Sequence, residues 1–216
     1  MRRLLGAALL LVLALARGYE AAHAATCVST VYVTVGTIQA AVNGIGPSFA
    51  GGDYCIYIDV TPTRQYTEQV LIEGINTDGN RIIIAADPAM GGAARTAVRA
   101  PGGGLGAAFT IRNASVTLRQ IDVSDNGAGI PFGIHISSAY VTLSSVAVHS
   151  QLIYDSGVKI ASTGWTTIAY SSSDMMGANA FYLAESSTVM RGQLLDVSYG
   201  RTWRACDESP RSHRRR

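Results

Sequence analysis

Charged side chains are scarce in this sequence: Asp, Glu, Lys and Arg make up 15% of the 216 residues, and aromatic residues only 7%. Between Ala25 and Trp203 there are nine basic and twelve acidic side chains, a net charge of −3. A chain of this charge lacks the basic surface that nucleic-acid binding needs, so no nucleic-acid partner is expected. Beyond residue 16, no apolar stretch approaches the roughly 20 residues of a membrane-spanning helix. We therefore expect no membrane span after the first segment is removed.

Motifs for metals and nucleotides are also missing. The four histidines are scattered without the paired spacing of a metal site. The glycine-rich run Gly102–Gly106 lacks the Lys-Ser/Thr that makes a phosphate-binding loop specific. We interpret Pro88–Gly106, which contains this run, as a loop. No cofactor is predicted.

The first 24 residues have the features of a signal peptide. Arg2 and Arg3 precede a 13-residue apolar run, Leu4–Ala16, and Ala22-His23-Ala24 gives the small residues of a cleavage site. A membrane anchor and a lipoprotein signal, the latter because of Cys27, are the alternatives. The prediction is a secreted protein, located outside the cell, on its surface or in the periplasm.

A repeat dominates the segment from Ala107 to Val148. FTI at Phe109–Ile111 corresponds to GIHI at Gly133–Ile136, and VTLRQIDV at Val116–Val123 corresponds to VTLSSVAV at Val141–Val148, both at an offset of 25 residues. Short β-type runs at such a period are typical of a stacked solenoid. The sequence therefore predicts an all-β parallel solenoid that spans residues 25–203 as one domain.

Aligning the repeats assigns side chains to faces, because successive residues of a strand point to opposite sides. The outward column consists of Thr110, His135, Lys159 and Tyr182, and their aliphatic neighbours line the interior. Inward pairs of the second strand are Val116/Leu118, Val141/Leu143 and Thr166/Ile168, followed by Val189 or Met190. The third strand gives Ile121/Val123, Val146/Val148 and then Ser171/Ser173. This last pair predicts a less well-filled core near the C-terminus, where Val189–Trp203 is expected to form the final coil.

A short amphipathic helix is predicted near the start of the domain. Ile38, Ala41, Val42 and Ile45 recur at helical spacing after Thr37, a plausible N-cap residue. Such a short helix is not stable alone, so it must pack on the domain. We expect a capping helix at about residues 37–44 that covers the first coil.

TIQAAV at Thr37–Val42 and YTEQVLI at Tyr66–Ile72 resemble the start of pectin methylesterases and related proteins of the pectate-lyase-like superfamily. The resemblance covers Gly36–Ala86 by motif and the remainder by periodicity. It implies a right-handed parallel β-helix. Arg64 stands where the family has a glycine, and the G-F-x-A-x-D and D-x-I/V-F-G runs around the family's catalytic aspartates are absent. The motif therefore indicates the fold rather than the activity.

Three cysteines are present: Cys27, Cys55 and Cys206. In a secreted chain, Cys27 and Cys55 can form a disulfide that ties the cap to the first coil, and two free thiols are the alternative. Cys206 belongs to the basic segment 204–216, which we interpret as a disordered or out-of-frame tail.

Candidate functional residues follow from the outward positions. Under an enzyme hypothesis, Asp122, His135 and Lys159 are the catalytic candidates, and Asp122 and Asp125 are candidate Ca²⁺ ligands for a lyase. Under a binding hypothesis, Tyr140, Trp165 and Tyr182 are candidates for stacking on sugar rings. We favour a non-catalytic module that binds a polysaccharide or cell-surface glycan or has a structural role. The alternatives are a polysaccharide lyase or pectinesterase-like enzyme, and a fragment of an adhesin or autotransporter-like passenger.

Overall fold

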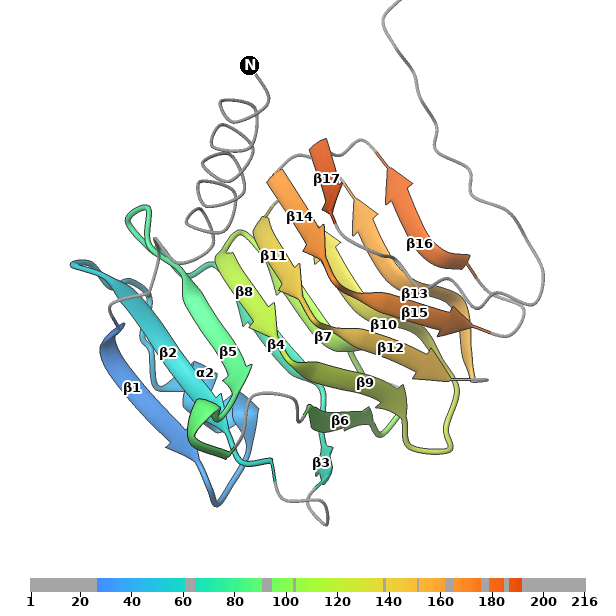
Figure 1. Cartoon of the computed structure of the whole chain (residues 1–216), viewed down its shortest axis with the longest axis horizontal. Coiled ribbons are helices and arrows are strands. Elements are labelled where there is room, and N and C mark those ends of the chain that lie inside the picture. Colours follow the sequence, from blue (N-terminus) through green and yellow to red (C-terminus); the bar gives the residue numbers. More distant parts are fainter. Residues whose placement is uncertain are drawn as a thin grey trace, which may run out of the picture.

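The chain folds as a parallel β-helix with very little α-helix, as predicted (Figure 1). This computed structural model describes residues 27–60, 65–90, 95–102, 104–137, 139–150, 152–161, 165–175, 179–184 and 187–191. The predicted signal peptide, most of the expected final coil, the basic tail and Cys206 lie outside the described residues.

Three parallel sheets form the walls of a solenoid of about six turns. The seven-stranded sheet contains β1 (Cys27–Val33), β2 (Asp53–Ile58), β5 (Ile82–Ala86), β8 (Ser115–Arg119), β11 (Tyr140–Ser144), β14 (Trp165–Ala169) and β17 (Ser187–Arg191). What we call the His135 sheet contains β4 (Val70–Glu73), β7 (Ala107–Arg112), β10 (Ile130–Ser137), β13 (Ile153–Ala161) and β16 (Asn179–Ala184). The Asp122 sheet contains β3 (Gln65–Thr67), β6 (Thr96–Ala100), β9 (Ile121–Asp125), β12 (Ala147–Ser150) and β15 (Ser172–Met175). From β2 to β16, consecutive strands such as β8, β9 and β10 belong to different sheets, so each of these turns adds one strand to each wall.

Strand β6 corrects one prediction. The glycine-rich segment Pro88–Gly106 was expected to be a loop throughout, but it contains a short 3-10 helix, Pro88–Met90, and then the strand Thr96–Ala100. Val98 and Ala100 of this strand are fully buried, and Val98 pairs with Val123 of the next coil. The segment therefore contributes a complete strand to the Asp122 sheet.

The predicted alignment of the repeats is confirmed by the strand register. His135 pairs with Thr110 on one side and with Lys159 on the other, and Lys159 pairs with Tyr182. In the seven-stranded sheet, Ile168 is in register with Met190, so Met190 rather than Val189 occupies the repeat position of Ile168.

The described core is a continuous stack of mainly aliphatic side chains that also includes two buried aromatic residues, Tyr66 and Phe109. The interior becomes more polar towards the end of the described chain, where the predicted serine pair, Ser171 and Ser173, is buried. The Ser171 hydroxyl donates to the carbonyl of Ala169 and accepts from the backbone N–H of Val146. The Ser173 hydroxyl has no hydrogen-bond partner among the described residues. The last described turns are therefore stabilised by fewer apolar contacts than the first.

The capping helix α2 runs from Ile38 to Asn43 and buries Ile38 and Val42. Its N-terminus is held from two sides: the Thr37 side chain accepts a hydrogen bond from the Ala40 N–H, and the Glu68 carboxylate accepts from the N–H groups of Ile38 and Gln39, both at 2.9 Å. A carboxylate at this position satisfies otherwise unpaired donors and complements the helix dipole. The amide side chain of Gln39 also bonds the N–H and the carbonyl of Leu71. Two residues of the motifs noted above, Gln39 and Glu68, thus fasten the helix to the coil beneath it.

Candidate functional site

The outward face of the His135 sheet carries a cluster of cationic and aromatic side chains. Lys159, the only lysine in the sequence, has its Nζ atom 4.5 Å from the centre of the Phe132 ring and 5.8 Å from that of Tyr182. The His135 ring lies beside the same Phe132 ring, with 5.1 Å between the ring centres. An ammonium group over an aromatic face is attracted by the electrons of the ring. The register and these contacts together fix the position of Lys159.

The electrostatics of this cluster are positive. The pKa of His135 lies below its ordinary value of 6.5, first because of burial and then because of the positive charges of Lys159 and Arg112. The Arg112 guanidinium is 3.9 Å from the Glu73 carboxylate, and both of these side chains are substantially exposed. Within the described residues, neither Lys159 nor His135 has a carboxylate partner.

The lowered pKa predicts that the protein becomes less stable when the pH falls below about 6.5. In that range the unfolded chain binds a proton at His135 before the folded chain does, so the free energy of unfolding decreases with decreasing pH. The decrease from this residue levels off below the folded pKa. Urea unfolding at pH 7.5 and 5.5 measures the change, and His135→Gln should make it smaller. An unchanged pH dependence in His135→Gln would contradict the prediction.

Thr110 differs from the prediction that its whole column is exposed. Its side chain is completely buried, and its hydroxyl has no hydrogen-bond partner among the described residues. Strand alternation assigned the face correctly, but it does not reveal what covers a residue from outside. Because buried polar groups are normally hydrogen-bonded, this hydroxyl requires an explanation.

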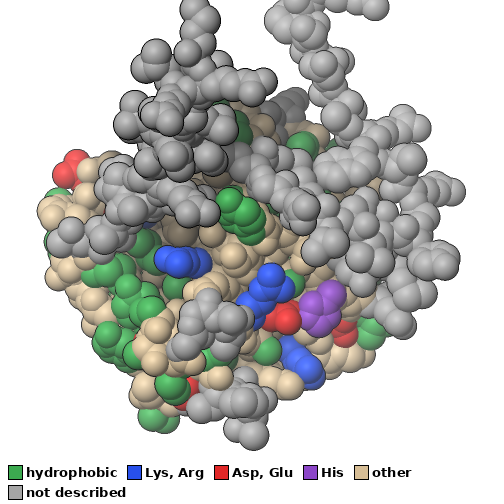
Figure 2. Space-filling model, in the orientation of Figure 1, with side chains coloured by type: hydrophobic (Ala, Val, Ile, Leu, Met, Phe, Trp, Pro, Cys, Tyr) green, Lys and Arg blue, Asp and Glu red, His purple; other side chains and the backbone are tan. Residues whose placement is uncertain are grey.

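Of the three catalytic candidates, His135 and Lys159 are neighbours, but Asp122 is not beside them. Asp122 lies on β9, in a different sheet, and its carboxylate contacts Nε2 of His149 on β12. Figure 2 shows an acidic side chain and a histidine in contact, with basic side chains nearby, on the face that carries these strands. The pair is diagonal, because Asp122 is in register with Ala147 rather than with His149.

The two candidate Ca²⁺ ligands, Asp122 and Asp125, both lie on β9, and the Asp125 carboxylate accepts a hydrogen bond from the N–H of Gly127 at 2.7 Å. In the part of the chain that the structure describes, no group of three or more His, Cys, Asp or Glu residues could hold a metal ion.

Two of the three aromatic candidates occupy consecutive coils of the seven-stranded sheet. Tyr140 begins β11 and Trp165 begins β14, and they are 65% and 53% exposed. The neighbouring residues Val141 and Thr166 are in register, so Tyr140 and Trp165 follow one another in a single column. Ser115 and Ser187 continue this column on either side. Tyr182, 44% exposed, lies on the His135 sheet and belongs to the other cluster.

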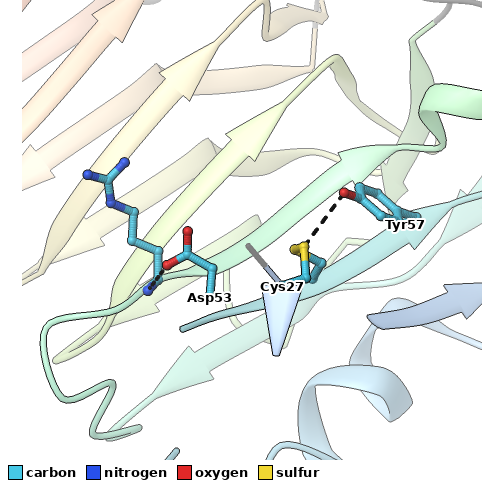
Figure 3. Close-up of a disulfide and its surroundings, with 5 residues drawn as sticks. Cys27, Asp53 and Tyr57 are labelled. Carbon is cyan, nitrogen blue, oxygen red and sulfur yellow. Dashed lines mark hydrogen bonds between the residues drawn. A yellow bond between two sulfur atoms is a disulfide. The ribbon is translucent and has the colours of Figure 1, made fainter. Parts of the chain in front are cut away.

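Cys27 and Cys55 are joined by a disulfide that ties β1 to β2 (Figure 3). Beside it, the Sγ atom of Cys27 is 3.8 Å from the hydroxyl of Tyr57. The carboxylate of Asp53 accepts a hydrogen bond from the backbone N–H of Arg81 at 2.8 Å, which links β2 to the next coil. These contacts hold strands together, so we interpret this end of the sheet as structural.

Among the described residues, no helix has the length and hydrophobicity needed to cross a membrane. No family model, no curated protein and no solved structure matches the chain.

Proposed function

We propose that this protein is a secreted surface module that binds a glycan without turning it over, and that Tyr140 and Trp165 form the platform for the sugar. The observation that carries this proposal is the exposure of two large aromatic side chains in one column of a regular sheet. Aromatic side chains offer rigid apolar faces against which sugar rings can stack. Adjacent strands of a sheet lie about 4.8 Å apart, so the two side chains can contact neighbouring parts of one saccharide.

The dispersal of the catalytic candidates supports binding rather than catalysis. Proton abstraction and charge stabilisation require acid, base and cation around one reacting atom. The Asp122 carboxylate is instead engaged by His149, on a sheet that does not carry His135 or Lys159. We extend the proposal to a relationship with pectate-lyase-like β-helix proteins, supported by the capping roles of Gln39 and Glu68. The disulfide is consistent with an oxidising compartment outside the cytoplasm.

Alanine substitutions test the proposed platform. Stacking on an aromatic residue contributes about 0.5–1.5 kcal/mol beyond buried area, so Trp165→Ala and Tyr140→Ala should each weaken binding roughly 2- to 13-fold. A glycan array identifies a ligand, and calorimetry then compares the variants with the unchanged protein. Tyr154→Ala is the matched control, because Tyr154 is 66% exposed but lies on another sheet. Equal binding by all three variants would contradict the proposed platform.

A further inference from the structure

Three nitrogen-bearing side chains meet on neighbouring strands of the His135 sheet, away from the Tyr140–Trp165 column. Arg112 is on β7, His135 on β10 and Lys159 on β13. Lys159 is directly opposite His135, whereas Arg112 is diagonal to it because it pairs with Ser137. With strands about 4.8 Å apart and a rise of about 3.3 Å per residue, the His135 backbone lies roughly 5 Å from that of Lys159 and roughly 8 Å from that of Arg112, and Lys159 and Arg112 are roughly 12 Å apart.

Little negative charge balances this group. Among the described residues, Glu73 is the carboxylate that approaches it, and its contact is with Arg112, at 3.9 Å. Lys159 and Arg112 both lie close enough to His135 for their positive charges to lower its pKa, after the larger effect of burial. A convergence of like charges is unfavourable unless an anion relieves it.

The buried hydroxyl of Thr110 is a second, independent observation. Thr110 is next to His135 in the register and adjacent to Arg112 on its own face of β7, and its hydroxyl has no partner among the described residues. An oxygen acceptor bound at the cluster would satisfy this donor. The rings of Phe132 and Tyr182 flank Lys159 and provide apolar walls for whatever carries the anion.

We propose that Arg112, His135 and Lys159, with the Thr110 hydroxyl, form a binding site for a tetrahedral oxyanion, the group shared by sulfate esters and phosphate monoesters. The donors stand on three neighbouring strands of one face, so they are spread over the sheet rather than paired at one point. The three free oxygens of a tetrahedral oxyanion spread out in three directions and can accept from several separate donors. A carboxylate has only two acceptor oxygens, and both lie in one plane. Arg112 and Lys159 supply permanent positive charge, and neutral His135 supplies one N–H donor.

The single lysine gives this site a specific probe. Reductive methylation with ¹³C-formaldehyde labels Lys159 and the α-amine and leaves the positive charge of both groups. The labelled full chain is titrated with a sulfated oligosaccharide, with the same oligosaccharide after desulfation, which retains its uronates, and with a sugar phosphate. We expect the Lys159 methyl resonance to shift with the sulfated or the phosphorylated ligand at lower concentration than with the desulfated one. Whichever of these two binds more tightly identifies the source of the oxyanion.

Substitutions complete the test. Lys159→Gln and Arg112→Gln should each weaken binding of the preferred ligand roughly tenfold, as expected for a lost charge-assisted hydrogen bond. Arg119→Gln, which removes an exposed arginine from the seven-stranded sheet, should leave it unchanged. Thermal unfolding confirms that each variant is folded. A Lys159 resonance that does not move, equal binding of the desulfated ligand, or an equal loss in Arg119→Gln would overturn the proposal. Failure of the Tyr140–Trp165 platform would leave these results unaffected.

Discussion

Replacing Phe109 with alanine is expected to lower the free energy of unfolding by about 3–5 kcal/mol. Phe109 is completely buried in β7, an inner strand of the His135 sheet, in register with Val70 of one coil and Ile134 of the next. It is the largest of the fully buried side chains in the described core. Its removal leaves a cavity, because the hydrogen-bonded strands around it cannot move inward to fill the space. Urea unfolding at neutral pH measures the loss.

Thr110→Val is the matched control for this substitution. It changes the adjacent buried residue, preserves the shape of the side chain and removes a hydroxyl that has no partner among the described residues. Removing an unsatisfied buried polar group should be neutral or stabilising in the absence of ligand. A loss of less than about 1 kcal/mol in Phe109→Ala, well short of the range for a buried Phe, would contradict the described core.

Loss of the Cys27–Cys55 disulfide is expected to cost about 3–4 kcal/mol. The two cysteines are 28 residues apart, and a closed loop of this length removes that much conformational entropy from the unfolded chain. In the folded state the bond fixes β1, the outermost strand of the seven-stranded sheet, to β2. The double variant Cys27→Ala/Cys55→Ala, made in a Cys206→Ser background, isolates the contribution of this bond.

Reductant provides the second arm of this experiment. Dithiothreitol should lower the urea midpoint of the Cys206→Ser protein to that of the double variant and should not affect the double variant itself. Identical midpoints for the oxidised protein and the double variant would show that the disulfide does not stabilise this end of the solenoid.

The repeat was sufficient to predict the register of the coils, because stacked strands place residues of equal repeat position side by side. His135 and Lys159 were therefore recognised as neighbours from their sequence positions alone. The helix α2 was predictable for a similar reason, since the Thr37 cap and the helical spacing of Ile38 and Val42 are local signals. Strand β6 was not predictable in this way. Its residues are mostly small, glycines surround it, and its pairing partner β9 is visible only once the coils are closed.

Features that depend on contacts between coils could not be predicted from the sequence either. The repeat predicts direct neighbours, whereas Asp122 meets His149 diagonally, two positions beyond the repeat offset. Phe132 contacts Lys159 and His135 next to a register shift between Ile130 and Phe132, and regular alternation does not anticipate such a shift. The complete burial of Thr110 was not visible in the repeat either, since His135 in the same column is only partly buried. The repeat period was thus enough to predict the parallel β-helix and its register. It was not enough to predict which side chains contact one another on the surface.

One measurement tests most directly whether the outer surface binds glycan and leaves it intact. The full-length protein is equilibrated with the best array ligand in a calorimeter, with and without Ca²⁺, and the saccharide is then recovered and weighed by mass spectrometry. We predict saturable binding that Trp165→Ala weakens, together with a recovered saccharide of unchanged mass. A shortened, unsaturated or de-esterified product that disappears in Asp122→Ala would contradict the proposed function and show that the protein is an enzyme.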